Sequence, residues 1–172
     1  MKFLKHLAVV TLSFLFCFSA FADKLKVGFV YVGPVGDHGW TYMHEQGRLA
    51  VKKAFGDKVE TTFIESVKYG PEAETVIRAM ANSGTDLIFA TSFGYMEPML
   101  KVAKEFPNVK FEHATGYKTN DNMSVYSSKF YQGRYIQGVI AGHMSKNGKA
   151  GYICLLYTSD AADEEDSVDL GG

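Results

Sequence analysis

Cysteine is almost absent from this 172-residue chain, which has only Cys17 and Cys154. Because Cys17 falls in the apolar leader described below, the mature chain would keep one cysteine and could form no internal disulfide. A metal site is equally unsupported. His44 and Glu45 begin an HExxH pattern, but Arg48 stands where the second histidine ligand of zinc is needed, and no other His, Cys and carboxylate set has ligand spacing. We therefore predict no metal and no cofactor.

The chain also lacks an excess of one charge and a long apolar run. Its 18 basic and 19 acidic residues nearly cancel, which gives no nucleic-acid footprint and no polybasic membrane patch. The apolar run at residues 7–18 is shorter than the ~20 residues that a bilayer span requires. It follows a basic start and precedes Ala20-Phe21-Ala22, a small-x-small site. This pattern predicts a secretory signal peptide over residues 1–22, with a membrane anchor as the alternative.

The C-terminal residues 154–172 differ in composition from the rest. They hold six acidic residues and no lysine or arginine. We expect a non-native acidic tail that is disordered; a native acidic, disordered tail is the alternative. The remaining residues, 23–153, suffice for one domain with a single core.

Within this body, β-rich and helical patterns alternate. Strands are predicted at 25–31, 59–64, 86–90, 109–114, 123–126 and 149–153, and helices at 40–55, 71–82, 95–106 and 130–144. Alternation of this kind indicates βαβ units and a parallel sheet. We expect an α/β fold, doubly wound, with the flavodoxin-like strand order 2-1-3-4-5. A ligand should then bind at the carboxyl ends of the strands, near the switch point between strands one and three.

The loop after the first strand is rich in glycine and leads to the only tryptophan, Trp40. Its glycines would let the backbone approach a ligand closely, and the indole could stack on a planar ring, although packing of Trp40 in the core is equally compatible with the sequence. Asp37 could accept hydrogen bonds from a ligand or cap the following helix. His38 is either a polar contact or a solvated loop residue.

The loop after the third strand supplies further candidates: Ser92, Phe93, Gly94 and Tyr95. Loops after the fourth and fifth strands add hydroxyls and an aromatic residue, but no cluster of charge. Aromatic faces with a few polar groups suit a small neutral ring better than a phosphate or a metal ion.

Two enzyme patterns are close to the sequence but incomplete. Glycines at 33, 36 and 39 approach a dinucleotide-binding loop, but their spacing is wrong and Pro34 intrudes. Ser92 stands at a strand-to-helix turn, like a hydrolase nucleophile elbow, but Ala90 replaces the first glycine. A secreted serine hydrolase using Ser92 therefore remains only an alternative.

Four segments carry a family resemblance: GPVGDHGWTY (33–42), DLIFATSFGY (86–95), FEHATGY (111–117), and FYQGRY (130–135) with GVIAG (138–142). In order and spacing they resemble the basic membrane protein (BMP) family, the substrate-binding proteins of ABC importers. The resemblance covers about residues 25–153. It implies a periplasmic binding protein type I fold, in which two α/β lobes close on a ligand.

The branch with this loop resembles periplasmic members that bind purine bases or nucleosides without chemistry. The resemblance implies that Trp40 stacks on the purine, with Asp37, Ser92, Phe93 and Gly94 lining the first lobe. It implies an ABC permease in the inner membrane as partner, a periplasmic location, and no direct membrane insertion after signal cleavage. A same-fold receptor for another small ligand, such as a sugar, is an alternative.

The resemblance also divides the body. Residues 23–128 correspond to the N-terminal lobe, and residues 129–153 to the first helix and strand of a second lobe. Because family chains continue for about as long again, we expect this chain to be truncated after about residue 153.

Overall fold

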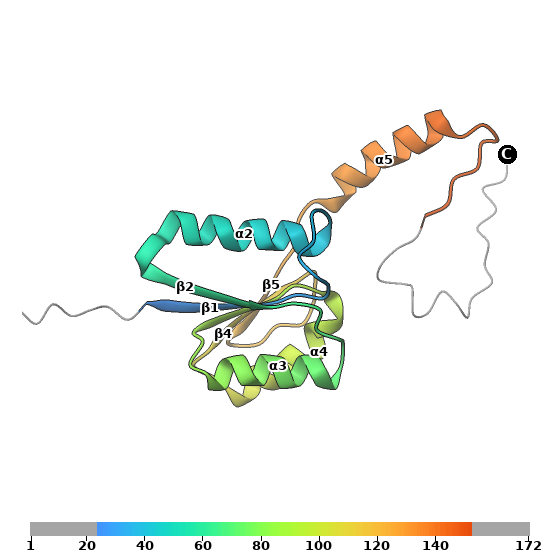
Figure 1. Ribbon diagram of the computed structural model, residues 1–172. Helices are drawn as coiled ribbons and strands as arrows, with labels where there is room; N and C mark the ends of the chain where they lie inside the picture. The colour runs from blue at the N-terminus through green and yellow to red at the C-terminus, as the bar shows by residue number, and fades with distance from the viewer. Residues whose placement is uncertain (1–23, 153–172) are drawn as a thin grey trace, which may run out of the picture.

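The computed structural model describes residues 24–152, which fold around one five-stranded parallel sheet (Figure 1). The strands are β1 (Leu25–Val30), β2 (Val59–Ile64), β3 (Leu87–Ala90), β4 (Lys110–Ala114) and β5 (Met123–Tyr126). Their order is β2-β1-β3-β4-β5, so the predicted doubly wound topology is confirmed. The signal peptide and the acidic tail predicted above lie outside the described residues.

Helices cover the two faces of the sheet unequally. They are α2 (Trp40–Phe55), α3 (Pro71–Asn82), α4 (Met96–Glu105) and α5 (Phe130–Met144). Helix α2 covers one face, whereas α3 and α4 cover the other (Figure 1). The larger core lies under α3 and α4, where Ile77, Ile88 and Met99 are fully buried. On the α2 side, the buried apolar residues are Val27 and Phe29 of β1 and Tyr31, which follows β1.

Backbone chemistry explains where the helices begin and end. Pro71 occupies the first turn of α3, where its missing N–H costs nothing, and Gly84 follows the end of the helix with a left-handed φ of 80°. Helix α4 begins one residue later than predicted because Phe93–Tyr95 form a short 3₁₀ turn ahead of it. Sequence periodicity alone does not separate such a turn from the helix that follows.

The predicted strand at 149–153 is wrong for its described residues, because 149–152 form no regular secondary structure. A strand requires a neighbour to satisfy its backbone hydrogen bonds, and none pairs with this segment in the described chain.

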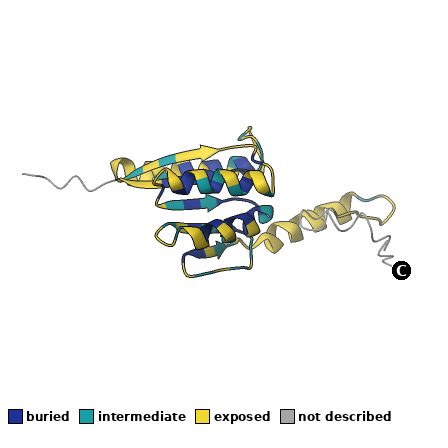
Figure 2. Cartoon of the chain, turned by 90° about the horizontal axis from the view of Figure 1, so that it is seen from below, coloured by how far each residue is buried: buried dark blue, intermediate teal, exposed yellow. Residues whose placement is uncertain are grey.

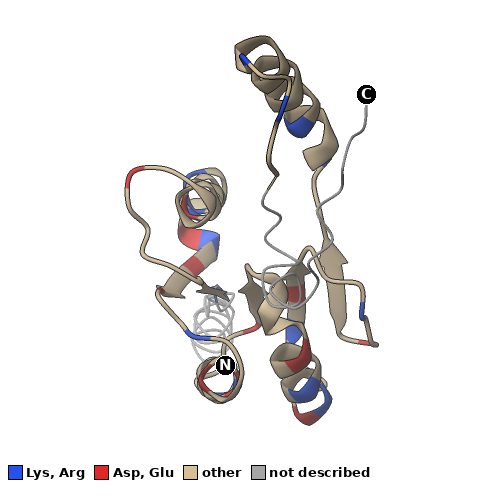
Figure 3. Cartoon of the chain, turned by 90° about the vertical axis from the view of Figure 1, so that its right-hand side faces the viewer, with Lys and Arg blue, Asp and Glu red and all other residues tan. Residues whose placement is uncertain are grey.

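Helix α5 projects away from the sheet (Figures 1 and 2). All of its residues are exposed, including Tyr135 (74%) and Ile136 (60%). The acidic residues of the described chain lie on the sheet body and not on α5, whose one residue of either charge is Arg134 (Figure 3). In the sheet body, Arg78 of α3 pairs with Glu105 of α4 at 2.8 Å and so ties these two helices together. The division between lobes at residues 128 and 129 coincides with the start of α5 and remains a prediction.

Candidate ligand-binding site

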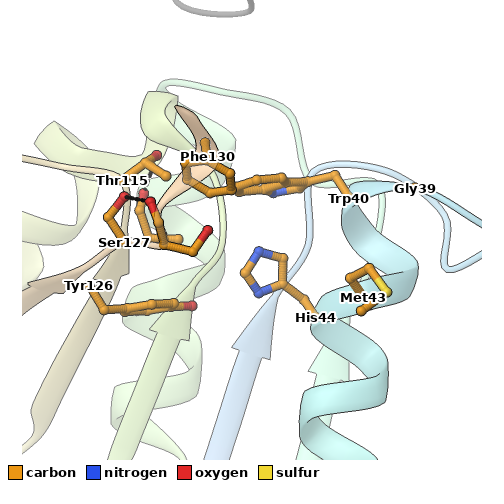
Figure 4. A pocket seen from close by; sticks show the side chains of 10 residues that line it. Gly39, Trp40, Met43, His44, Thr115, Tyr126, Ser127 and Phe130 are labelled. Atoms are coloured by element: carbon orange, nitrogen blue, oxygen red, sulfur yellow. Dashed lines mark hydrogen bonds between the residues drawn. The ribbon is translucent and has the colours of Figure 1, made fainter. Parts of the chain in front are cut away.

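A cavity of about 530 Å³ opens at the carboxyl edge of the sheet, between the start of α2 and the ends of β4 and β5 (Figure 4). It is lined by Gly39, Trp40, Met43, His44, Ala114, Thr115, Tyr126, Ser127, Ser128 and Phe130. The cavity lies at the edge of the sheet where the sequence predicts a ligand. The cavity lies on the β4–β5 side of the switch point, however, because the loop after β3 does not line it.

Trp40 is half-buried at the first position of α2 and forms part of the cavity wall. Its indole Nε1 donates a hydrogen bond of 2.5 Å to the carbonyl oxygen of Thr91, at the end of β3. The Phe130 ring lies beside the indole, with ring centroids 5.7 Å apart and planes inclined by 38°. The structure therefore fixes the indole N–H on the protein and leaves the ring as an apolar surface at the cavity.

A buried ion pair holds α2 against the sheet below this wall. Arg48 donates to the Glu45 carboxylate through Nε at 2.8 Å and through Nη2 at 2.5 Å. The hydroxyl of Tyr31, the residue after β1, donates to the same carboxylate at 3.0 Å. These hydrogen bonds, that of Arg48 first, hold the pKa of Glu45 below its usual value. Arg48, which breaks the zinc pattern in the sequence, thus has a structural role, since it pairs a buried carboxylate that would otherwise be costly.

His44 lies one turn after Trp40 on the same side of α2 and points into the cavity (Figure 4). Its ring meets Trp40 edge to face at 4.8 Å and approaches Tyr126 of β5 at 6.4 Å. Burial lowers the pKa of His44, so the imidazole is neutral at pH 7. Burial, together with the charge of Glu112, raises the pKa of Tyr126 to about 12. Both groups therefore face the cavity uncharged.

The hydroxyl groups of the opposite cavity wall belong to residues that come directly after β4 and β5. Thr115 has a φ of 66°, which is rare for a β-branched residue, and its N–H donates to the Tyr126 carbonyl at 2.8 Å. The Thr115 hydroxyl donates to the Ala114 carbonyl at 2.6 Å, and that of Ser127 to the Ser128 carbonyl at 3.4 Å. None of the lining residues is an acid, a lysine or an arginine, so the cavity carries no formal charge.

Asp37 and His38 lie in the exposed loop before α2 and do not line the cavity. The alternative role for Asp37, as the cap of this helix, is wrong. The residue at the cap position is Gly39, with a φ of 95°, and no side chain bonds to the free N–H groups there. A ligand role for either residue remains a prediction.

The four residues predicted from the loop after β3 do not line the cavity. Tyr95 is fully buried, and its hydroxyl donates to the Val67 carbonyl at 2.5 Å. Gly94 lies so close to Tyr69 that an added Cβ would stand 2.5 Å from its ring. Phe93 is half-buried against the larger core. The loop therefore supports Trp40 through the Thr91 carbonyl and offers the cavity no side chain of its own.

Ser92 lacks the geometry of a nucleophile. It is 1% exposed, and its hydroxyl shares a hydrogen bond of 2.8 Å with the hydroxyl of Tyr69. The nearby His113 points Nε2 at the carbonyl oxygen of Ser92, at 2.9 Å, instead of at its hydroxyl. Since a carbonyl only accepts, Nε2 carries the proton and is not a base for the serine. This arrangement does not support the serine hydrolase alternative.

Sequence reasoning missed His44, Tyr126 and Phe130 as cavity residues. His44 was considered only as a zinc ligand. Its position four residues after Trp40 was the available signal, because residues at this spacing share a helix face. Phe130 had no such signal, since its distance from Trp40 depends on how the chain leaves β5.

The described part of the chain holds no cluster of three or more histidine, cysteine or acidic residues that could bind a metal ion. Within 24–152, no helix combines the length and apolar character needed to cross a bilayer.

Comparison with known proteins places this site in a family. Residues 24–165 match the model of the Bmp family, which is described as "ABC transporter substrate-binding protein PnrA-like". The chain is 65% identical over 149 residues to "Purine-binding protein BAB2_0673" of Brucella abortus, covering 87% of this chain and 43% of that protein. It is 35% identical over 149 residues to "Putative ABC transporter glucose-binding protein TsgA13" of Haloferax volcanii, covering 87% of this chain and 38% of that one.

Solved structures agree on the fold. An ABC transporter solute-binding protein from Conexibacter woesei superposes with a TM-score of 0.58 and 27% identity, over 69% of this chain and 40% of that one. One from Aeropyrum pernix superposes with a TM-score of 0.60 and 26% identity, over 72% and 34%.

The chain spans about two fifths of the length of the curated relatives named above. The family match reaches residue 165, so the expectation that the resemblance ends at residue 153 is not confirmed. By its matched range and its fold, the chain belongs to the Bmp family of PnrA-like ABC transporter substrate-binding proteins.

Proposed function

We propose that this chain is the first lobe of an extracytoplasmic receptor that captures a purine base or nucleoside for an ABC importer. The observation that carries the proposal is the neutral aromatic cavity at the carboxyl edge of the sheet, with Trp40, Tyr126 and Phe130 in its wall. A flat, uncharged heterocycle satisfies such a wall better than a phosphate, which would need basic groups or free backbone N–H groups.

Stacking supplies the affinity in this proposal. An aromatic platform contributes about 1–3 kcal/mol for each base that it holds. A sugar can also pack its C–H face on an aromatic ring, but it depends on many hydrogen bonds to its hydroxyls, and the described wall has few free hydroxyls. The relative at 65% identity is a protein whose name gives it as purine-binding, which supports a purine over a sugar.

The remaining features of the proposal follow from the family. Receptors of this kind deliver their ligand to a permease in the inner membrane, so the protein would work in the periplasm after its leader is removed. It would bind its ligand unchanged, which is consistent with the hydroxyl of Ser92 being occupied by Tyr69. Closure of a second lobe would complete the site, because this cavity surrounds a ligand on one side only.

Isothermal titration with adenine, guanosine and glucose tests the proposal. Because one lobe supplies one wall, we expect weak purine binding, with a Kd above about 100 µM, and no heat with glucose. Trp40→Ala should abolish the purine signal. Tyr117→Ala removes an exposed aromatic outside the cavity and serves as the matched control.

Two results would count against the proposal. Glucose binding in preference to both purines would transfer the assignment to a sugar receptor. Sub-micromolar purine affinity from this chain alone would refute the need for a second lobe.

A further inference from the structure

The cavity presents two polar groups that no neighbour uses. Neither the His44 imidazole nor the Tyr126 hydroxyl has a hydrogen-bond partner among residues 24–152, whereas the indole N–H of Trp40 is taken by Thr91. Both point into the same space (Figure 4). Both residues are partly buried, so polar groups of this kind, without a protein partner in a cavity, are suited to receive a ligand.

The orientation of His44 is set by its aromatic neighbours. The planes of the Trp40 and His44 rings are inclined by 65°, and those of His44 and Tyr126 by 71°. A ligand ring parallel to Trp40 or Tyr126 would therefore be steeply inclined to the imidazole plane, which favours contact through an imidazole nitrogen over stacking on its face. Ring nitrogens and amino groups of a heterocycle make their hydrogen bonds in the plane of the ring, at its edge.

We propose that His44 is a specificity-determining residue that hydrogen-bonds the edge of the stacked heterocycle. The inference rests on the proposed function, since it concerns the same cavity. A neutral imidazole presents a donor at one ring nitrogen and an acceptor at the other, so the nitrogen that faces the cavity can pair with either an N–H group or a ring nitrogen of the ligand edge, and adenine carries both. The aromatic walls then select for a flat ring, and His44 selects among flat rings.

Adenine and benzimidazole separate these two contributions. Both are fused bicycles, but benzimidazole lacks the nitrogens and the amino group of the six-membered ring. The full chain with labelled histidine and tryptophan side chains is titrated with each compound and followed by NMR. Adenine should shift the Trp40 and His44 resonances along one curve and leave those of the exposed His143, outside the cavity, unchanged.

His44→Phe preserves a flat aromatic side chain but removes the edge contact. We expect this variant to bind adenine about three- to tenfold more weakly and to bind benzimidazole as the wild type does. His44→Gln, which retains a donor and an acceptor, should recover part of the preference for adenine. His143→Phe, at an exposed position of α5 outside the cavity, is the matched control, and circular dichroism establishes that each variant is folded.

The outcomes distinguish the two proposals. Unchanged adenine affinity in His44→Phe, or an equal loss for both compounds, would overturn the role of His44 while leaving a purine receptor in place. If adenine shifts neither His44 nor Trp40 in the wild type, both proposals fail.

Discussion

The indole nitrogen of Trp40 lies 2.5 Å from the carbonyl oxygen of Thr91, a residue 51 positions further along the chain. This hydrogen bond joins the first turn of α2 to the end of β3, and thus the two sides of the topological switch point. It also settles what the tryptophan can offer a ligand, because a nitrogen that already donates to the protein leaves only the ring surface free.

Trp40→Phe tests this link. Phenylalanine keeps an apolar ring at the cavity but leaves the Thr91 carbonyl without its donor. We expect the free energy of unfolding to fall by about 1 kcal/mol, measured by urea denaturation followed by circular dichroism. Tyr42→Phe, in the same turn of α2, is the control and should have little effect. Equal stability of Trp40→Phe and the wild type would mean that the hydrogen bond contributes nothing to the fold.

His113 should make the fold sensitive to acid. Its side chain is fully buried, and burial lowers its pKa, an effect only partly offset by the hydrogen bond to Ser92. His113 therefore binds a proton near pH 6.5 in the unfolded state, but only at a lower pH in the folded state. The free energy of unfolding should be highest above about pH 6.5 and decrease as the pH falls below that value. The pKa of His44 is also lowered by burial, so His44 should add a decrease of the same sign.

Urea midpoints measured between about pH 5 and 7.5 check this dependence. In His113→Gln, where an amide replaces the titrating ring, the slope should be shallower than in the wild type. An unchanged slope in His113→Gln would show that this residue does not cause the acid sensitivity.

Three glycines should respond differently to alanine because their surroundings differ. At Gly116 an added Cβ would stand 2.4 Å from Nδ1 of the fully buried His113, which has no room to move. At Gly94 the added atom would meet Tyr69, whose side chain is half exposed and can shift. At Gly47, inside α2, nothing lies within 4 Å.

We therefore expect Gly116→Ala to cost about 2–3 kcal/mol of unfolding free energy and Gly94→Ala about 1 kcal/mol. Gly47→Ala should raise the free energy of unfolding by about 0.5–1 kcal/mol, because alanine is more favourable than glycine in a helix interior. Thermal or urea denaturation gives the ranking. A larger loss at Gly94 than at Gly116 would contradict the argument from side-chain mobility.

Helix α5 should cause this chain to associate with itself. Its apolar side chains stand in solvent, among them Ile136 (60%) and Ile140 (52%), and exposed apolar surface of this extent favours contact with another surface. Light scattering after size exclusion should give a mass that rises with concentration. Ile136→Lys with Ile140→Lys should reduce the association, whereas Lys52→Arg on the exposed side of α2 should not. A wild-type chain that stays monomeric at every concentration would contradict the prediction.

The fold was predictable because the elements are separated by residues with strong local preferences. Helix α2 has the predicted ends, set by Gly39 before it and Gly56 after it. Strand order followed from the rule that parallel crossovers are right-handed. The strand predicted at 149–153 is absent from residues 149–152, because a strand depends on a neighbouring strand and no local sequence pattern shows whether one is present.

The site was harder to predict than the fold. Trp40 lies in the cavity wall at the edge where the sequence predicts a ligand, whereas the hydroxyls of Ser92 and Tyr95 bond to Tyr69 and Val67, residues distant in sequence. Such long-range partners are not visible in the chain order. Whether Asp37, His38 and the loop after β3 contact a ligand stays a prediction.

Trp40 is also the only tryptophan in the chain, and it forms part of the cavity wall. Its fluorescence therefore reports on a single location, free of the overlapping emission that complicates most proteins of this size. A ring that enters the cavity should quench the indole or change its emission wavelength directly. The protein thus carries an intrinsic optical probe at the place where its ligand is expected to bind.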